Sequence, residues 1–195
     1  MENKIYFTPQ FMYTQSIMQK NQRIILYILI LIAGAAWIVI SADDTGRLAS
    51  TSAPQAGFTA PDFTLQSPSG ETYTLSKLRG QAVLVNLWAT WCPPCRAEMP
   101  TIEKMYQAYK DQKFIVLAIN MTYQDDPFAV VPFLKDHNLT FPTVLEETGD
   151  VAAAYQLRSL PSSYFINREG VITEVVIGGP MSEALLRTRI EQILK

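Results

Sequence analysis

The two cysteines of this 195-residue chain, Cys92 and Cys95, are the residues whose type and spacing best suit chemistry. A thiolate is both a nucleophile and a metal ligand, so the pair suits a redox site, a structural disulfide or half of a zinc site. A zinc site would need two further ligands, and His137 is the only histidine. A structural disulfide across so short a loop would add little stability. The pair therefore predicts redox chemistry, with no metal and no other cofactor.

A buried strand followed by a helix is expected to position the two cysteines. Residues 82–88 (AVLVNLW) are almost continuously apolar, as in a strand covered on both faces. Residues 93–112 follow as a helix, with Pro93 at its first position, where a missing N–H costs nothing. Cys92 then lies at the helix start, where free N–H groups and the helix dipole favour a thiolate. Cys95 lies one turn on, within reach of a disulfide, so Cys92 is predicted to attack and Cys95 to resolve.

The other apolar patterns predict an α/β fold. Polar turns separate the apolar segments of residues 58–195. The order of the strands and helices that these segments predict implies a mixed sheet covered by helices on both faces. Pro100 is expected to interrupt and kink the helix that carries the cysteines. Ser182 is expected to cap the last helix, and Asp125 and Asp126 to begin an earlier one. The further strands are predicted at 62–65, 71–75, 114–120, 143–146, 162–167 and 171–177, and the further helices at 127–138, 150–155 and 182–194.

The N-terminal segment predicts a membrane anchor. Residues 24–42 are 19 residues without a charge, and about 20 helical residues cross a bilayer. Lys20 and Arg23 precede them, which places residues 1–23 in the cytoplasm and the rest of the chain outside the cell membrane. A cleaved signal peptide would have a shorter apolar core and small residues at its cleavage site, where this chain has Ile40. Residues 43–57 have the composition of a linker, and residues 58–195 are expected to form the folded domain.

Residues 86–100 (NLWATWCPPCRAEMP) resemble the thioredoxin superfamily, and within it the membrane-anchored TlpA/ResA-like thiol–disulfide oxidoreductases. Residues 60–65 are similar to the N-terminal hairpin of that branch, and residues 160–166 (LPSSYFI) to its strand that follows a cis-proline. The resemblance implies a thioredoxin-like fold with an N-terminal hairpin and a central αβ insertion near residues 127–146. It also implies that Pro161 is cis and faces the two sulfurs.

The resemblance further assigns roles to individual residues. Glu98, one helical turn after Cys95, matches an acid implicated in thiol proton handling; the alternative is a solvated helix glutamate. Thioredoxin has a buried acid where this chain has Asn86, and because an amide cannot take up that proton, interest moves to Glu98. Trp88 is expected to pack beneath the cysteine loop, and His137 to be a surface residue at a helix end. The residues expected to bind the client chain are Trp91, Pro93, Pro94, Leu160 and Pro161.

Together these observations favour an extracytoplasmic reductase of disulfides in exported proteins. The resemblance implies that its clients are apocytochrome c or proteins of envelope and spore maturation, and that a transmembrane thiol donor supplies its electrons. The same scaffold would also suit an oxidase that forms disulfides, because the Pro-Pro dipeptide does not set the reduction potential. A peroxiredoxin-like thiol peroxidase and a non-enzymatic assembly module are further alternatives. The formal net charge of −2 argues against nucleic-acid binding, and we expect a monomer.

Overall fold

The computed structural model describes residues 22–37 and 52–195, which belong to two separate compact units, Met1–Ala49 and Ser50–Lys195. Residues 22–37 are helical. Within the described ranges no helix is both long and apolar enough to cross a membrane. The predicted anchor reaches residue 42, so its last five residues lie outside those ranges, as do residues 1–21 of the predicted tail and 43–51 of the linker.

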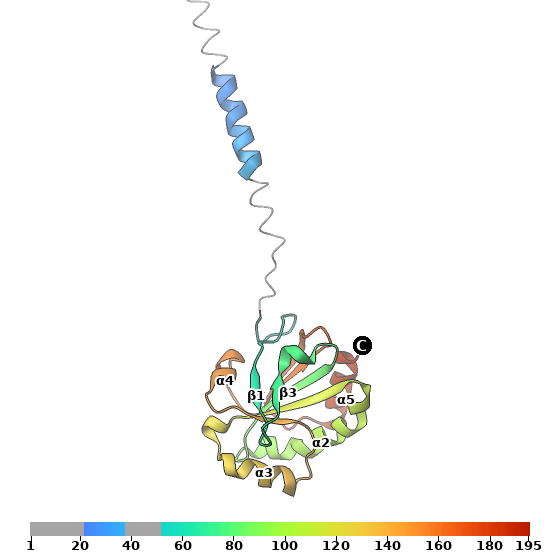
Figure 1. Cartoon of the computed structure of the whole chain (residues 1–195). Helices are drawn as coiled ribbons and strands as arrows, with labels where there is room; N and C mark the ends of the chain where they lie inside the picture. Colours follow the sequence, from blue (N-terminus) through green and yellow to red (C-terminus); the bar gives the residue numbers. More distant parts are fainter. Residues whose placement is uncertain (1–21, 38–51) are drawn as a thin grey trace, which may run out of the picture. The chain divides into compact units, whose positions relative to one another are not determined.

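A seven-stranded mixed sheet forms the centre of the second unit (Figure 1), as the sequence predicts. The strand order is β2-β1-β5-β4-β3-β6-β7. Strands β3, β4 and β5 pair in parallel, and the other pairs are antiparallel. The strands are β1 (Thr64–Gln66), β2 (Thr72–Thr74), β3 (Ala82–Trp88), β4 (Phe114–Asn120), β5 (Thr143–Leu145), β6 (Ser162–Ile166) and β7 (Ile172–Ile177).

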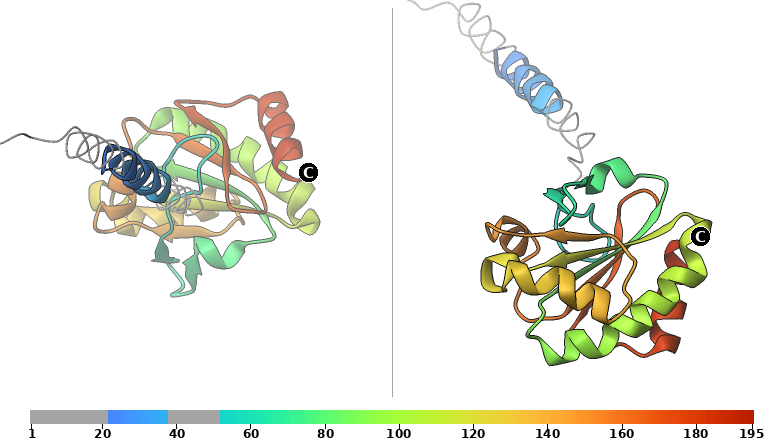
Figure 2. Two further views of the ribbon diagram at one scale, coloured as in Figure 1. Left: turned by 90° about the horizontal axis from the view of Figure 1, so that it is seen from above. Right: turned by 60° about the horizontal axis from the view of Figure 1, so that its bottom comes forward.

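Helices and short connections cover both faces of this sheet (Figure 2). The longer helices are α2 (Pro93–Tyr109), α3 (Pro127–Asp136) and α5 (Glu183–Ile193), and a short α4 (Asp150–Ala154) follows β5. Buried residues of α2, α3 and α5 share one apolar cluster with Leu84 and Trp88 of β3. Buried residues of α4 share the other cluster with Val83 and Val85. Because strand residues alternate between faces, Asn86 belongs to the face that α2 covers.

The structure contradicts one prediction about the helices, at Pro100, and confirms another, at Ser182. The predicted interruption at Pro100 is wrong, because α2 continues through that proline to Tyr109. The buried stripe of Met99, Ile102 and Met105 packs on the sheet, and such packing holds a helix together where one hydrogen bond is missing. At the start of α5, the Ser182 hydroxyl accepts the N–H of Leu185 at 3.3 Å, which confirms the predicted cap.

Candidate active site

Cys92 and Cys95 form a disulfide at the start of α2, with their Cα atoms 5.3 Å apart. Cys92 is the N-cap residue of α2, and its Sγ accepts the N–H of Cys95 at 3.3 Å. Pro93 occupies the first helical position, as predicted. Cys92 is 2% exposed to solvent, and Cys95 is fully buried. The helix start therefore offers hydrogen-bond donation to the Cys92 sulfur, which is what a developing thiolate needs.

Glu98 lies one turn after Cys95 and is completely buried, which excludes the alternative of a solvated helix glutamate. Its Oε1 accepts a hydrogen bond from Asn86 Nδ2 at 2.9 Å, and its Oε2 accepts the N–H of Met181 at 3.3 Å. Burial raises the pKa of the Glu98 carboxyl, and these two hydrogen bonds partly oppose the rise. A carboxyl with a raised pKa one helical turn from a redox cysteine is suited to accept and return a proton.

Gly179 brings Glu98 and Pro161 together. The Leu160–Pro161 bond is cis, as expected, and so is Gly179–Pro180. A Cβ atom at residue 179 would lie 2.7 Å from Glu98 Oε2 and 2.8 Å from Pro161 Cγ, so no larger residue fits without movement. The backbone N–H of Gly178 donates to the Pro161 carbonyl at 2.8 Å. The loop after β7 therefore connects the acid on α2 to the proline before β6.

A network that the sequence did not reveal fixes the loop in front of Cys92. The Asp125 carboxylate accepts the Thr90 N–H at 2.6 Å and also the Thr90 hydroxyl. Asn120 Nδ2 donates to the same carboxylate at 2.8 Å. The sequence predicted that Asp125 and Asp126 begin a helix, which α3 confirms, and of the two it is Asp126 whose side chain caps it. The contact between Asp125 and Thr90 could have been expected from the parallel pairing of β3 and β4. The carboxyl ends of parallel strands meet at one sheet edge, and each of these residues follows one of the two strands.

The residues expected to bind a client differ in their exposure. Trp91 is 56% exposed, and its indole N–H donates to the Gln124 carbonyl at 3.0 Å. Pro93 is exposed, Pro94 and Leu160 are half-buried, and Pro161 is buried. Trp91 therefore presents a large apolar surface immediately before Cys92.

Two aromatic residues on the α2 side of the sheet have structural surroundings. Trp88 is fully buried, and its ring centroid lies 5.0 Å from that of Phe133, as expected for a residue beneath the cysteine loop. His137 is the C-cap residue of α3, half-buried, with its ring stacked on Phe133 at 4.2 Å. The prediction of a histidine at a helix end is confirmed, although its ring is partly covered.

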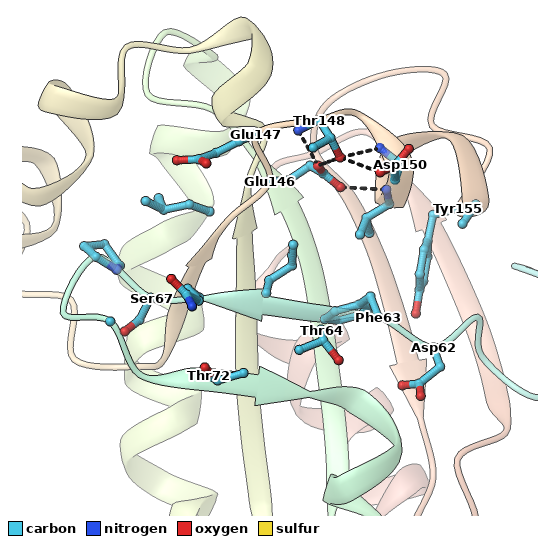
Figure 3. A pocket seen from close by; sticks show the side chains of 17 residues that line it. Asp62, Phe63, Thr64, Ser67, Thr72, Glu146, Glu147, Thr148, Asp150 and Tyr155 are labelled. Atoms are coloured by element: carbon cyan, nitrogen blue, oxygen red, sulfur yellow. Dashed lines mark hydrogen bonds between the residues drawn. The ribbon is translucent and has the colours of Figure 1, made fainter.

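A separate pocket of about 810 Å³ lies between β1 and the segment that follows β5 (Figure 3). Neither cysteine lines it. Its buried acid, Glu146, accepts the N–H groups of Thr148, Gly149 and Val151, at 2.9, 2.9 and 2.6 Å. Those hydrogen bonds close the turn into α4, so the carboxylate has a structural partner for each of its oxygens.

Comparisons with known proteins agree with this geometry. Residues 56–175 match the AhpC/TSA family. The chain is 32% identical over 173 residues to the thiol-disulfide oxidoreductase ResA of Geobacillus kaustophilus, covering 87% of this chain and 96% of that protein. A Chlorobium tepidum protein described as a thiol:disulfide interchange protein DsbE superposes with a TM-score of 0.66 at 28% identity, covering 74% of this chain and all of its own.

A second solved structure has a similar fold. It is a secreted Mycobacterium tuberculosis disulfide oxidoreductase, described as homologous to DsbE of E. coli. Its TM-score is 0.60 at 26% identity, over 67% of this chain and 95% of its own. The family match includes both cysteines and Glu98. The chain therefore belongs to the thioredoxin-like AhpC/TSA family, and it is a thiol–disulfide oxidoreductase.

Proposed function

We propose that this protein is held in the bacterial cell membrane by residues 24–42 and reduces disulfides of exported proteins outside the cytoplasm. The observation that carries the chemistry is the Cys92–Cys95 disulfide at the start of α2, with the buried Glu98 carboxyl one turn beyond it. Clients of the proposed kind are chains whose cysteines must be reduced before use, such as an apocytochrome c, whose haem-attachment motif is Cys-x-x-Cys-His.

The anchoring part of the proposal is supported by two observations on the N-terminal segment and by one relative of similar fold. Residues 24–42 carry no charge, and Lys20 and Arg23 precede them. The alignment with ResA covers 87% of this chain, which is more than residues 52–195, so the similarity extends into the N-terminal segment. One relative of similar fold is described as secreted.

The reaction begins from the reduced protein. The Cys92 thiolate attacks one sulfur of the client disulfide, forms a mixed disulfide and releases the first client thiolate, which takes up a proton. Cys95 then gives its proton to the Glu98 carboxylate, and its thiolate attacks the Cys92 sulfur. The second client sulfur leaves as a thiolate and takes that proton back from Glu98, and the protein retains the Cys92–Cys95 disulfide. Two electrons have passed to the client, and a membrane dithiol donor must return them for the next cycle.

Pro161 and Trp91 are proposed to hold the client chain during this exchange. Pro161 lies beside Gly179 in the loop region next to Glu98, and Trp91 is the exposed aromatic residue adjoining Cys92. Pro93, Pro94 and Leu160 would complete this surface. An extended client would thereby lie across the cysteine loop, with its disulfide against Cys92.

A trapping experiment with a defined client tests the chemistry. The full chain in mild detergent is reduced and mixed with a peptide that carries an oxidised Cys-x-x-Cys-His motif. The Cys95→Ala variant should accumulate a covalent adduct through Cys92, because nothing resolves it, whereas Cys92→Ala should form none. An adduct that forms with Cys92→Ala and not with Cys95→Ala contradicts the proposed roles.

A labelling experiment tests the location. A membrane-impermeant maleimide added to intact cells expressing the Cys95→Ala variant should label Cys92 after reduction. A single cysteine introduced at residue 10 of a cysteine-free variant provides the matched control, and it should be labelled only after the cells are opened. Labelling of Cys92 only in opened cells contradicts an extracytoplasmic domain.

A further inference from the structure

Asn86 is a polar residue in the middle of a strand whose every residue is buried. Its Nδ2 group donates to Glu98 Oε1 and to Ser163 Oγ, both at 2.9 Å. An amide nitrogen has two hydrogens, so both are used. Asn86, Glu98 and Ser163 are each at most 1% exposed. The three side chains therefore form a buried hydrogen-bond chain from β6 across β3 to the acid on α2.

The sheet holds this chain in place. Asn86 and Ser163 are directly opposite each other in the antiparallel pairing of β3 with β6. Residues on adjacent strands in that relation keep their side chains close on one face. The Asn86 amide consequently has a fixed neighbour on one side and Glu98 on the other, and Ser163 determines how the amide is turned.

The oxygen of the Asn86 amide makes no hydrogen bond within the described part of the chain. Asn86 Oδ1 is buried and has no hydrogen-bond partner among the residues the structure describes. The two ends of an amide have nearly the same shape, so half a turn would place Oδ1 where Nδ2 now lies. In that orientation it would accept from a protonated Glu98 carboxyl and from the Ser163 hydroxyl, which both donates and accepts.

We propose that Asn86 and Ser163 are positioning residues that serve both protonation forms of Glu98, the Asn86 amide donating to the carboxylate and turning over to accept from the acid. This inference rests on the proposed function, in which Glu98 receives the Cys95 proton. The proton moves from the Cys95 thiol to a Glu98 oxygen, and Asn86 neither gains nor loses one. Because an amide does not titrate, Glu98 is the group among these three hydrogen-bonded side chains that takes up the proton.

The surroundings of Glu98 support this assignment. On α2 itself Cys95, one turn before Glu98, is held in the disulfide, and Arg96, two residues before it, is exposed and donates to the Thr90 carbonyl. From β3 the carboxyl meets Asn86, and from the loop after β7 it meets the Met181 N–H and Gly179. No charged side chain in the described part of the chain pairs with Glu98. Hydrogen bonds from neutral groups therefore stabilise the charged form, and Asn86 is the side chain that provides one.

Carboxyl-carbon NMR of the full chain in detergent micelles, labelled at glutamate, tests the positioning role. The Glu98 signal is assigned by its loss in Glu98→Gln. Asn86→Leu should raise the Glu98 titration midpoint by about one pH unit, a roughly tenfold shift toward the acid. Ser163→Ala should shift it about threefold in the same direction, since the amide loses the partner that orients it. An unmoved midpoint in either folded variant overturns the proposal, and Ser163→Ala decides it if Asn86→Leu does not fold.

The turning of the amide has its own readout in the wild-type protein. Above the Glu98 midpoint, the side-chain NH2 protons of Asn86 should show through-space contacts to the Ser163 methylene. Below the midpoint these contacts should disappear. Contacts of equal strength on both sides of the midpoint contradict the turnover.

Kinetics separate this inference from the proposed function. The rate at which the reduced protein reduces a small aromatic disulfide is measured against pH. Asn86→Leu should displace the profile in the wild type and change nothing further in a Glu98→Gln background, because coupled residues are non-additive. An equal effect in both backgrounds assigns Asn86 to packing and overturns the inference alone. A profile unchanged by Glu98→Gln contradicts the proton step of the proposed function.

Discussion

The Asp125 carboxylate accepts both the backbone N–H and the hydroxyl of Thr90, two residues before Cys92. This acid stands after β4, and Thr90 stands after β3, so a single side chain joins the ends of two neighbouring strands. The indole of Trp91 makes a parallel connection to the Gln124 carbonyl. The loop that presents the reactive cysteine is thereby fixed to the loop that leads into α3.

Asp125→Ala should therefore slow thiol–disulfide exchange about tenfold and destabilise the fold by about 1–3 kcal/mol, because the partly buried Thr90 N–H loses its acceptor. Stopped-flow reduction of a small disulfide and urea unfolding measure the two effects. Asp126→Ala is the matched control. It removes only the α3 cap, so it should cost about 1 kcal/mol and leave exchange unchanged. Equal exchange rates in the two variants would contradict the role of Asp125.

Gly179→Ala should slow exchange about tenfold, because the new methyl group would lie within 3 Å of Glu98 Oε2 and the Pro161 ring, so one of them must move. The neighbouring glycine provides the comparison. Gly178 has a φ of +88° and open space around it, so Gly178→Ala should lose about 1 kcal/mol of stability without slowing exchange. If exchange is as fast in Gly179→Ala as in the wild type, the packing of Glu98 and Pro161 on this glycine is irrelevant to the reaction.

Glu98 should make the stability of the domain fall as pH rises. Burial raises the pKa of Glu98 above 4.5, so between the unfolded and folded pKa values the unfolded chain releases a proton that the folded chain keeps. Its favourable contribution is complete below the unfolded pKa and is lost as pH rises through the folded pKa. Glu98→Gln should remove this decline, so in urea unfolding the variant should gain stability relative to wild type as pH rises above the unfolded pKa of the carboxyl.

Glu103 on the same helix should behave in the opposite way and serves as the control. Burial tends to raise its pKa, but hydrogen bonds from Thr140 and Gln107 lower it overall. The stability that Glu103 contributes is present above the unfolded pKa and is lost as pH falls through the folded pKa. Glu103→Gln should lose stability at neutral pH. The same sign of pH dependence for both variants would show that Glu98 is not held as the structure describes.

Trp91→Ala should raise KM for a disulfide peptide about tenfold with kcat nearly unchanged, because an exposed aromatic side chain contributes contact area to the client. Trp91→Phe keeps an apolar ring and loses the hydrogen bond to Gln124, so it should retain most of the affinity. Steady-state reduction of the peptide separates these cases. A phenylalanine variant as impaired as the alanine variant would show that Trp91 acts only through its hydrogen bond to Gln124 and contradict the client contact.

The order of strands and helices was predictable because buried strands and amphipathic helices leave different apolar periods. Strand β4 begins and ends where the sequence predicts, and Cys92 lies at the helix start. Strands β1 and β2, the last two at one side of the sheet, are shorter than predicted, since short half-buried strands leave a weak pattern. The resemblance indicated the cis bond at Pro161, which the residues alone did not distinguish from a strand-start proline.

The polar contacts around the cysteines were less predictable. The hydrogen bond between Asn86 and Ser163 spans 77 residues and depends on the register between β3 and β6, which the apolar pattern does not specify. The contact of Glu98 with Gly179 depends on the path of the loop after β7. The helix start after Asp125 and Asp126 is confirmed, but the sequence did not indicate which of the two caps α3 or that Asp125 binds Thr90 instead.

The reduction potential of the Cys92–Cys95 couple tests the central claim most directly. The full chain in mild detergent is equilibrated in glutathione or dithiothreitol buffers, and the fraction of free thiol is measured by alkylation. A reductase of exported proteins should have a potential below about −220 mV, in the range from glutaredoxins to thioredoxin. A potential near about −120 mV, the value of a strong disulfide-forming oxidase, would contradict the proposed direction of electron flow.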